Sequence, residues 1–170
     1  MALFANFKGK ALVVLVVLAA LSAAWYLGSP LFVSQTVAES FPVSTGTDLA
    51  SGAAGSVVLS QGGFTDADAF HKGEGVAKLY RLSDGSRLLR LEGFKVTNGP
   101  DLHVLLAANP APKDRRDLEQ GGYYNLGKLK GNIGDQNYQV PPDVAEGLAK
   151  SVVIYCLPFH VVFSTATLMP

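Results

Sequence analysis

Short runs of alternating apolar and polar residues dominate the chain over residues 57–170. In the stretch LHVLLA, Leu102, Val104 and Leu106 fall on one face of an extended strand and His103 falls on the other. Turn signals such as Asp-Gly and Asn-Gly-Pro separate these runs. This pattern predicts an all-β domain, an antiparallel β-sandwich, over the whole range.

The N-terminal part has a different pattern, a single long apolar run. Lys8 and Lys10 precede the run, and no further charged residue appears before Glu39. Because about 20 apolar residues can cross a bilayer as a helix, residues 11–29 predict one transmembrane anchor. Basic residues stay on the cytoplasmic side, which predicts that residues 1–10 are cytoplasmic. We therefore expect a single-pass protein of the cell membrane with an extracytoplasmic domain.

A cleaved signal peptide is the alternative interpretation of the same run. Ser22, Ala23 and Ala24 supply the small residues that a signal peptidase requires. Both interpretations export the remainder of the chain. Residues 30–56 are polar and then rich in Gly, Ser, Thr and Ala, without an apolar period. This composition predicts a flexible extracytoplasmic linker.

Charge and cysteine content narrow the classes of function. The 14 Lys and Arg residues balance the 14 Asp and Glu residues, so we expect no nucleic-acid partner. Cys156 is the only cysteine, which excludes a disulfide within the chain. The same count excludes the Cys-x-x-Cys-His motif of covalent c-type haem. The domain must therefore be held together by apolar burial.

Two stretches resemble known motifs without carrying their chemistry. Gly122–Lys128 matches the start of a phosphate-binding loop, but Leu129 stands where Ser or Thr would hold a metal. Asp66 and Asp68 have the spacing of EF-hand ligands, but His71 occupies the position that requires glycine. We expect turn and capping roles for these aspartates and predict no metal site.

The candidate chemistry lies around Cys156, between the strand-like runs VVIY and HVVF. One interpretation is a buried packing residue. The other is a redox thiol, or a soft ligand to a prosthetic group, sheltered from oxidation. His71, His103 and His160 are candidates to assist the thiol or bind a cofactor. Four residues of strand span about 13 Å, so His160 can share an ion with Cys156 only if the chain bends sharply at Pro158.

The chain also contains, in this order, the blocks GGFTDADAFHKGEGVAKLYRL, RLLRLEGFKVTNGPDLHVLL, LGKLKGNIGDQNYQVP and SVVIYCLPFHVVFSTATL. Together they resemble the DM-thirteen domain. This small extracellular domain is found beside DOMON domains in Skeletor-type proteins, and alone behind a membrane anchor in many bacteria. The resemblance extends from Val57 to Leu168. The stretch TVAESFP is similar to a segment that such bacterial proteins carry after the anchor.

The resemblance implies a β-sandwich and an electron-transfer role for the family's near-constant cysteine. That cysteine corresponds to Cys156, acting as a bare thiol or through a bound group such as haem. His103 departs from the family, in which we expect an aromatic residue such as Tyr. The cofactor and the redox partner stay unknown. The alternative is a non-enzymatic surface module that binds a ligand or a protein through its loops NGPD and GNIGDQNY.

Overall fold

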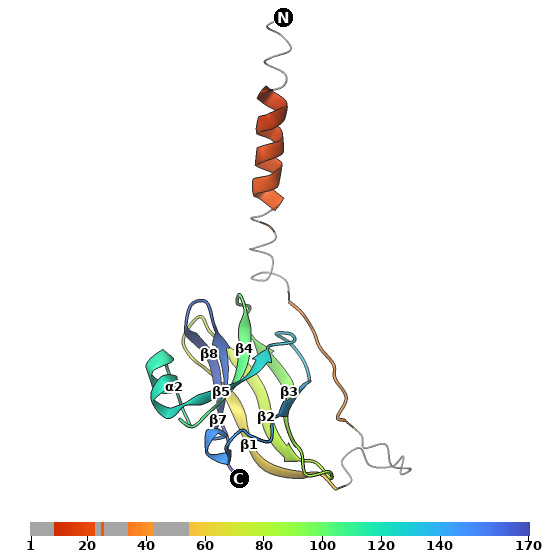
Figure 1. The fold of residues 1–170 in the computed structure, drawn as a ribbon, viewed down its shortest axis with the longest axis vertical. Helices are drawn as coiled ribbons and strands as arrows, with labels where there is room; N and C mark the ends of the chain where they lie inside the picture. Colours follow the sequence, from red (N-terminus) through yellow and green to blue (C-terminus); the bar gives the residue numbers. More distant parts are fainter. Residues whose placement is uncertain (1–8, 23–24, 26–33, 43–54) are drawn as a thin grey trace, which may run out of the picture. The chain divides into compact units, whose positions relative to one another are not determined.

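The computed structural model describes residues 9–22, 25, 34–42 and 55–170. The chain divides into two compact units, Met1–Val33 and Ser34–Pro170. The first unit contains a helix and the second contains a β domain (Figure 1).

The helix of the first unit is described over residues 9–22. Its apolar side chains are largely exposed, as Leu12 at 64% and Leu18 at 55% illustrate. Among the helices of the described residues, none combines the length and apolarity needed to cross a bilayer. The predicted helix is confirmed for this stretch. The predicted span 11–29 and the cleavage position both extend into residues outside those described, so the membrane anchor stays a prediction.

The second unit is built from eight antiparallel strands (Figure 1). The strands are β1 (Val57–Asp66), β2 (Gly73–Arg81), β3 (Arg87–Val96), β4 (Leu102–Ala107), β5 (Tyr123–Lys128), β6 (Gln136–Val140), β7 (Ser151–Cys156) and β8 (Val161–Thr167). Their spatial order is β5-β4-β7-β8-β1-β2-β3-β6. The predicted all-β antiparallel class is confirmed, and the strand predicted in LHVLLA is β4.

The β1 strand makes these strands one nearly closed barrel instead of the predicted sandwich of two sheets. Its first part pairs with β2, whereas Phe64–Asp66 pairs with β8. The change of partner follows Gly62 and Gly63, and a Cβ on Gly62 would collide with the carbonyl oxygen of Thr167. The two edge strands, β5 and β6, contact each other. Alternation along single strands could not reveal this, because barrels and sandwiches share the same period.

Apolar side chains gather on both faces of the strands. The barrel interior holds the larger cluster, with Phe94 and Ile154 fully enclosed. A smaller cluster lies on the outer face of β4 and β7 and includes Val153. The short helix α2 (Arg115–Gly121) covers this outer cluster with Leu118, which is 1% exposed. A 3₁₀ turn, η1 (Glu146–Leu148), precedes β7.

Part of the predicted linker 30–56 lies along the domain as the segment Ser34–Pro42, here called the strap (Figure 1). The Val37 amide donates to the Ile133 carbonyl at 2.9 Å, and the Ile133 amide donates to Gln35 at 3.2 Å. From Val37 to Pro42 along the strap, half-buried and exposed residues alternate. This alternation and the hydrogen bonds to Ile133 differ from the flexible segment that the polar composition predicts. Residues 30–33 and 43–54 lie outside those described.

Candidate functional site

Cys156 is the last residue of β7 and faces the barrel interior at one end. It pairs with Leu102 of β4 and with Val161 of β8, and it is 0% exposed. Its Sγ donates a hydrogen bond to the carbonyl oxygen of Pro100 at 3.0 Å. The thiol is therefore sealed in the core, and its proton has an acceptor.

The surroundings of Cys156 favour the neutral thiol. Burial raises the pKa of the thiol, and the charge of Asp101 raises it further, while the backbone N–H of Phe159 partly opposes this change. The ionised form of Asp101 is favoured, because its hydrogen bond with Lys128 lowers the pKa of its carboxyl group. Since the thiolate is the reactive nucleophile, a neutral buried thiol reacts slowly with disulfides and alkylating reagents.

Two turns, between β3 and β4 and between β7 and β8, close the barrel over Cys156. Each contains a residue in the left-handed region: Asp101 has φ of 51° and His160 has φ of 56°. No other non-glycine residue of the described chain has positive φ. The Leu157 amide donates to the Asp101 carbonyl at 3.3 Å, so the turns are connected. Such conformations are uncommon outside glycine and often occur at functional sites.

The candidate histidines do not converge on the thiol. His103 follows Leu102 in β4, so it faces outward whereas Leu102 and Cys156 face the interior. Its Nε2 lies 3.3 Å from Asp101 Oδ1, and its Nδ1 lies 3.2 Å from Asn125 Oδ1. His103 therefore contacts Asp101 and Asn125 on the outside of the barrel and does not face the sulfur of Cys156.

His160 and His71 lie in separate turns. The Nδ1 of His160 lies 3.4 Å from the hydroxyl of Tyr155. The Nδ1 of His71 lies 2.7 Å from Asp68 Oδ2, and its ring centroid is 4.2 Å from that of Phe163. The hydrogen bond from His71 lowers the pKa of Asp68 to about 2. Over the described ranges, no three His, Cys, Asp or Glu side chains are placed to hold one metal ion.

The two aspartates of the EF-hand-like stretch have local partners. Asp68 accepts hydrogen bonds from the amides of Phe70 and His71, at 2.7 and 2.8 Å. Asp66 accepts from the Gly73 amide at 3.0 Å and pairs with Lys72 at 2.9 Å. These contacts give both carboxylates the turn-forming role that the sequence predicts.

Haem bound through Cys156 does not fit this arrangement. An axial ligand needs open space beside the sulfur, whereas Cys156 is fully enclosed and its Sγ contacts Pro100 O. A cavity of about 550 Å³ lies at the other end of the barrel, between Arg87 and Pro142. A second, of about 310 Å³, lies beside Thr165. Cys156 lines neither cavity.

The buried polar groups of the loop GNIGDQNY are hydrogen-bonded to one another. Gln136 is 0% exposed, donates to the Gly131 carbonyl at 2.7 Å and accepts from the Tyr138 hydroxyl at 2.8 Å. Burial raises the pKa of Tyr138 to about 12, so this hydroxyl stays protonated. These buried groups are therefore satisfied without a ligand.

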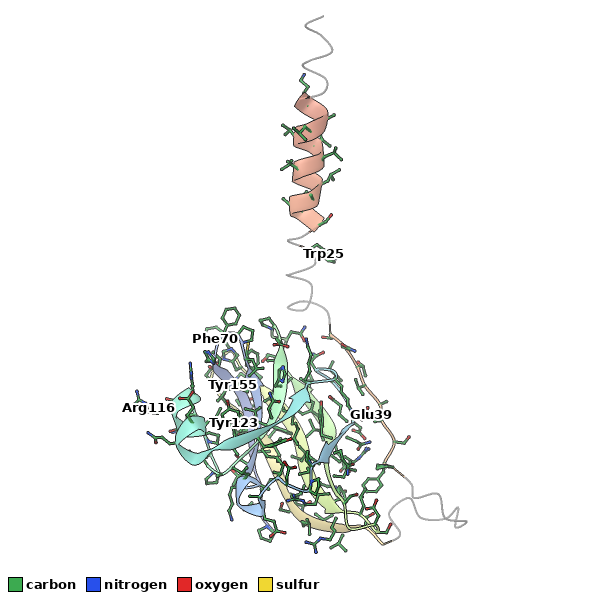
Figure 2. The ribbon with its side chains drawn as sticks, viewed as in Figure 1. Trp25, Glu39, Phe70, Arg116, Tyr123 and Tyr155 are labelled. Atoms are coloured by element: carbon green, nitrogen blue, oxygen red, sulfur yellow. The ribbon has the colours of Figure 1, made fainter. Side chains whose placement is uncertain are left out.

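The strap covers the same loop. Glu39 pairs with Lys130 at 2.8 Å and accepts from the Asn137 amide at 2.7 Å (Figure 2). A Cβ on Gly134 would collide with the carbonyl oxygen of Val37. The alternative function, ligand binding through GNIGDQNY, would therefore require the strap to leave.

Sequence reasoning missed several residues at the Cys156 end. Phe70 (Figure 2) is 83% exposed in the β1–β2 turn, and Phe159 is 67% exposed in the β7–β8 turn. Tyr155, next to the cysteine, lies in the outer cluster and contacts His160. Two sequence features could have indicated these residues: aromatic side chains inside the turn sequences TDADAFH and LPFH, and a tyrosine adjacent to the only cysteine.

Comparison with known proteins gives one result. A family model described as "Electron transfer DM13" matches residues 64–168, which is more than half of the chain. No curated protein and no solved structure shows a significant match. The match covers the β domain from the end of β1 through β8 and includes Cys156.

Proposed function

Because the chain belongs to the DM13 electron-transfer family, we propose that its β domain transfers single electrons and that Cys156 is the redox group. The observation that carries this proposal is the enclosed thiol, hydrogen-bonded to Pro100 directly beneath two surface turns. Enclosure blocks bulky reactants and protects the sulfur from irreversible oxidation. It does not block an electron, which can tunnel through packed protein.

The redox step removes one electron and one proton from the thiol. The electron passes to a one-electron acceptor, such as the metal centre of a partner protein, and the proton passes to solvent. The product is a thiyl radical, and the return of one electron and one proton restores the thiol. Disulfide exchange is a poorer fit, because it requires attack by an accessible thiolate, whereas Cys156 is buried and its pKa is raised.

An oxidative titration of the full chain tests this function. The protein is treated anaerobically with hexachloroiridate(IV), then with ascorbate, and thiol is counted after unfolding. We expect a loss of one electron and one thiol per chain, both recovered by ascorbate. Cys156→Ala is the control for oxidant consumed by other side chains, and its consumption is subtracted. Thiol that survives the oxidation, or a loss of thiol that ascorbate does not reverse, would contradict the proposal.

We also propose that the N-terminal apolar segment holds the domain outside a cell membrane. The support is the uncharged stretch that follows Lys8 and Lys10. Protease added outside intact cells should digest the β domain and leave the N-terminus protected. Protection of the whole chain would reject this topology. A mature N-terminus near Ala24 would identify a cleaved signal peptide instead.

Protein binding is a second candidate function, favoured by the exposed rings of Phe70 and Phe159. Aromatic side chains are common anchors of protein interfaces. A photo-crosslinking residue placed at position 159 should capture a defined partner from native membranes. The same residue at exposed Met169 serves as the control. A captured partner without a one-electron redox centre would favour the binding module over electron transfer.

A further inference from the structure

The enclosed position of Cys156 raises the question of how an electron reaches the surface. Tyr155 precedes Cys156 in β7, so the two side chains lie on opposite faces of the sheet. The register agrees: Cys156 pairs with Leu102, and Tyr155 pairs with His103. Cys156 belongs to the interior cluster and Tyr155 to the outer cluster. A single backbone link therefore connects the sealed interior to an aromatic ring on the other face.

The hydroxyl of Tyr155 has a basic partner at the surface. It lies 3.4 Å from Nδ1 of His160, and the two ring centroids are 6.4 Å apart. Tyr155 is 3% exposed, whereas His160 is exposed. His160 lies in the β7–β8 turn and has a left-handed backbone, with φ of 56°. Tyr155 (Figure 2) and His160 together therefore extend from the buried outer cluster to solvent.

We propose that Tyr155 and His160 form a proton-coupled relay that carries the electron between Cys156 and an external acceptor. This inference rests on the proposed electron-transfer function. In the first step, Tyr155 gives one electron to the acceptor, and its phenolic proton moves to Nδ1 of His160. The products are a neutral tyrosyl radical, a protonated imidazole and a reduced acceptor.

In the second step, Cys156 reduces the tyrosyl radical at Tyr155. One electron leaves the thiol for the tyrosyl radical, and the imidazolium returns its proton to the phenolate oxygen. The proton of the thiol passes to solvent. The net result is one electron and one proton lost from Cys156, as in the direct reaction. A neutral histidine with a free Nδ1 is required, because an oxidised phenol is a strong acid and must lose its proton to a base.

Another buried tyrosine supplies a contrast within the same domain. The hydroxyl of Tyr138 is enclosed and donates to Gln136 Oε1 at 2.8 Å. An amide oxygen accepts a hydrogen bond but is too weak a base to take the proton. Tyr138 therefore has a satisfied hydroxyl without a proton acceptor, whereas Tyr155 has a base. The difference assigns the relay to Tyr155.

The relay can be tested on the full chain with a flash-generated ruthenium(III) oxidant. Transient absorption and electron paramagnetic resonance follow the tyrosyl radical, and thiol is counted afterwards. We expect Tyr155→Phe to slow the oxidation of Cys156 at least tenfold, while the matched control Tyr123→Phe does not. His160→Gln should slow formation of the radical and abolish its solvent isotope effect. In Cys156→Ala the radical should form normally and decay more slowly than in the wild type.

Each other outcome has a definite meaning. Unchanged oxidation of Cys156 in Tyr155→Phe overturns the relay and leaves the proposed function intact. A tyrosyl radical that decays equally fast in the wild type and in Cys156→Ala overturns the link between Tyr155 and the thiol. Absence of thiol oxidation in every variant, with a normal radical at Tyr155, rejects the proposed function, and the relay to Cys156 fails with it. Circular dichroism verifies that each variant is folded.

Discussion

Two regions of this barrel use irregular backbone in opposite ways. In the loop GNIGDQNY the positive φ falls on glycine, 98° at Gly134. There the buried amide of Gln136 is satisfied inside the loop, and the strap covers the outside. At the Cys156 end, the positive φ falls on Asp101 and His160, and two phenylalanines are exposed. The loop is covered by the strap, whereas the end of the barrel near Cys156 leaves two aromatic rings in solvent.

The comparison also separates two interpretations of sequence patterns. The alternative function assigns binding to this loop, in which a Cβ on Gly134 would collide with the carbonyl oxygen of Val37. The plain stretch IYCLPFH, without a recognised motif, places a thiol, a phenol and an imidazole within one strand and its turn. Variants in the loop should therefore lower stability, whereas variants around Cys156 should mainly change its chemistry.

The largest effect is expected from Gly134→Val. The new side chain would collide with the strap carbonyl of Val37 and would strain a backbone with φ of 98°. We expect the free energy of unfolding to fall by about 3–4 kcal/mol, measured by urea denaturation. Gly147→Val is the control, because its Cβ would meet nothing within 4 Å. Equal stability of the two variants would show that the strap does not pack as described.

Deleting residues 34–42 should have the next largest effect. The deletion removes the backbone pairing to Ile133, the Glu39–Lys130 ion pair and the contact between the rings of Phe41 and Tyr80. We expect a loss of about 2–3 kcal/mol with a barrel that still folds. A deletion of nine residues within 43–54 removes none of these contacts and should be nearly neutral. If deletion of the strap left the free energy of unfolding unchanged, residues 34–42 would act as the flexible linker that the sequence predicts.

Substitution of Cys156 should be milder. Cys156→Ala leaves a small cavity and should cost about 1–2 kcal/mol. Cys156→Ser should cost less than Ala, because its hydroxyl can donate to Pro100 O, which accepts from the thiol at 3.0 Å. Thermal melts of both variants measure the order. A Ser variant clearly weaker than Ala would mean that Pro100 is not an acceptor for this group.

Glu39→Gln should have a smaller, pH-dependent effect. Burial alone raises the pKa of Glu39, but the hydrogen bonds from Lys130 and the Asn137 amide outweigh it and lower the pKa below its ordinary value. The ionised carboxylate therefore stabilises the fold above the unfolded-state pKa, and this contribution is lost as the pH falls through the lowered value.

At neutral pH we expect Glu39→Gln to cost about 1 kcal/mol, since the side chain is partly solvated. The cost should shrink as the pH drops below about 4. Urea denaturation across pH measures both effects. Glu146→Gln is the matched control, because Glu146 is 84% exposed and 3.9 Å from Arg81. A cost that does not change with pH would indicate that the ion pair is unimportant.

The smallest effect on stability is expected from Asp101→Asn. Asparagine tolerates the left-handed backbone, and the lost ion pair with Lys128 is exposed, so stability should change by less than about 0.5 kcal/mol. Removing the negative charge should nevertheless lower the pKa of Cys156, because Asp101 helps to raise it. Ultraviolet absorbance of the thiolate against pH measures this change, with Cys156→Ala as the blank. An unchanged thiol titration would remove Asp101 from the site.

The sequence by itself determined the all-β class, the strands on either side of Cys156 and the family. Period-2 alternation and turn residues are local signals, and a lone cysteine between two apolar runs is visible without coordinates. Family blocks in their order likewise need no structure. These features were predictable because each depends on neighbours a few residues apart.

Only the tertiary structure decided how those strands close and what surrounds the thiol. The switch of β1 between two partners, the strap over Gly134 and the acceptor Pro100, 56 residues from Cys156, all join distant parts of the chain. The strand register then placed Cys156 inside and Tyr155 outside. Alternation divides a strand into two faces, but packing against the rest of the barrel decides which face is buried in the interior.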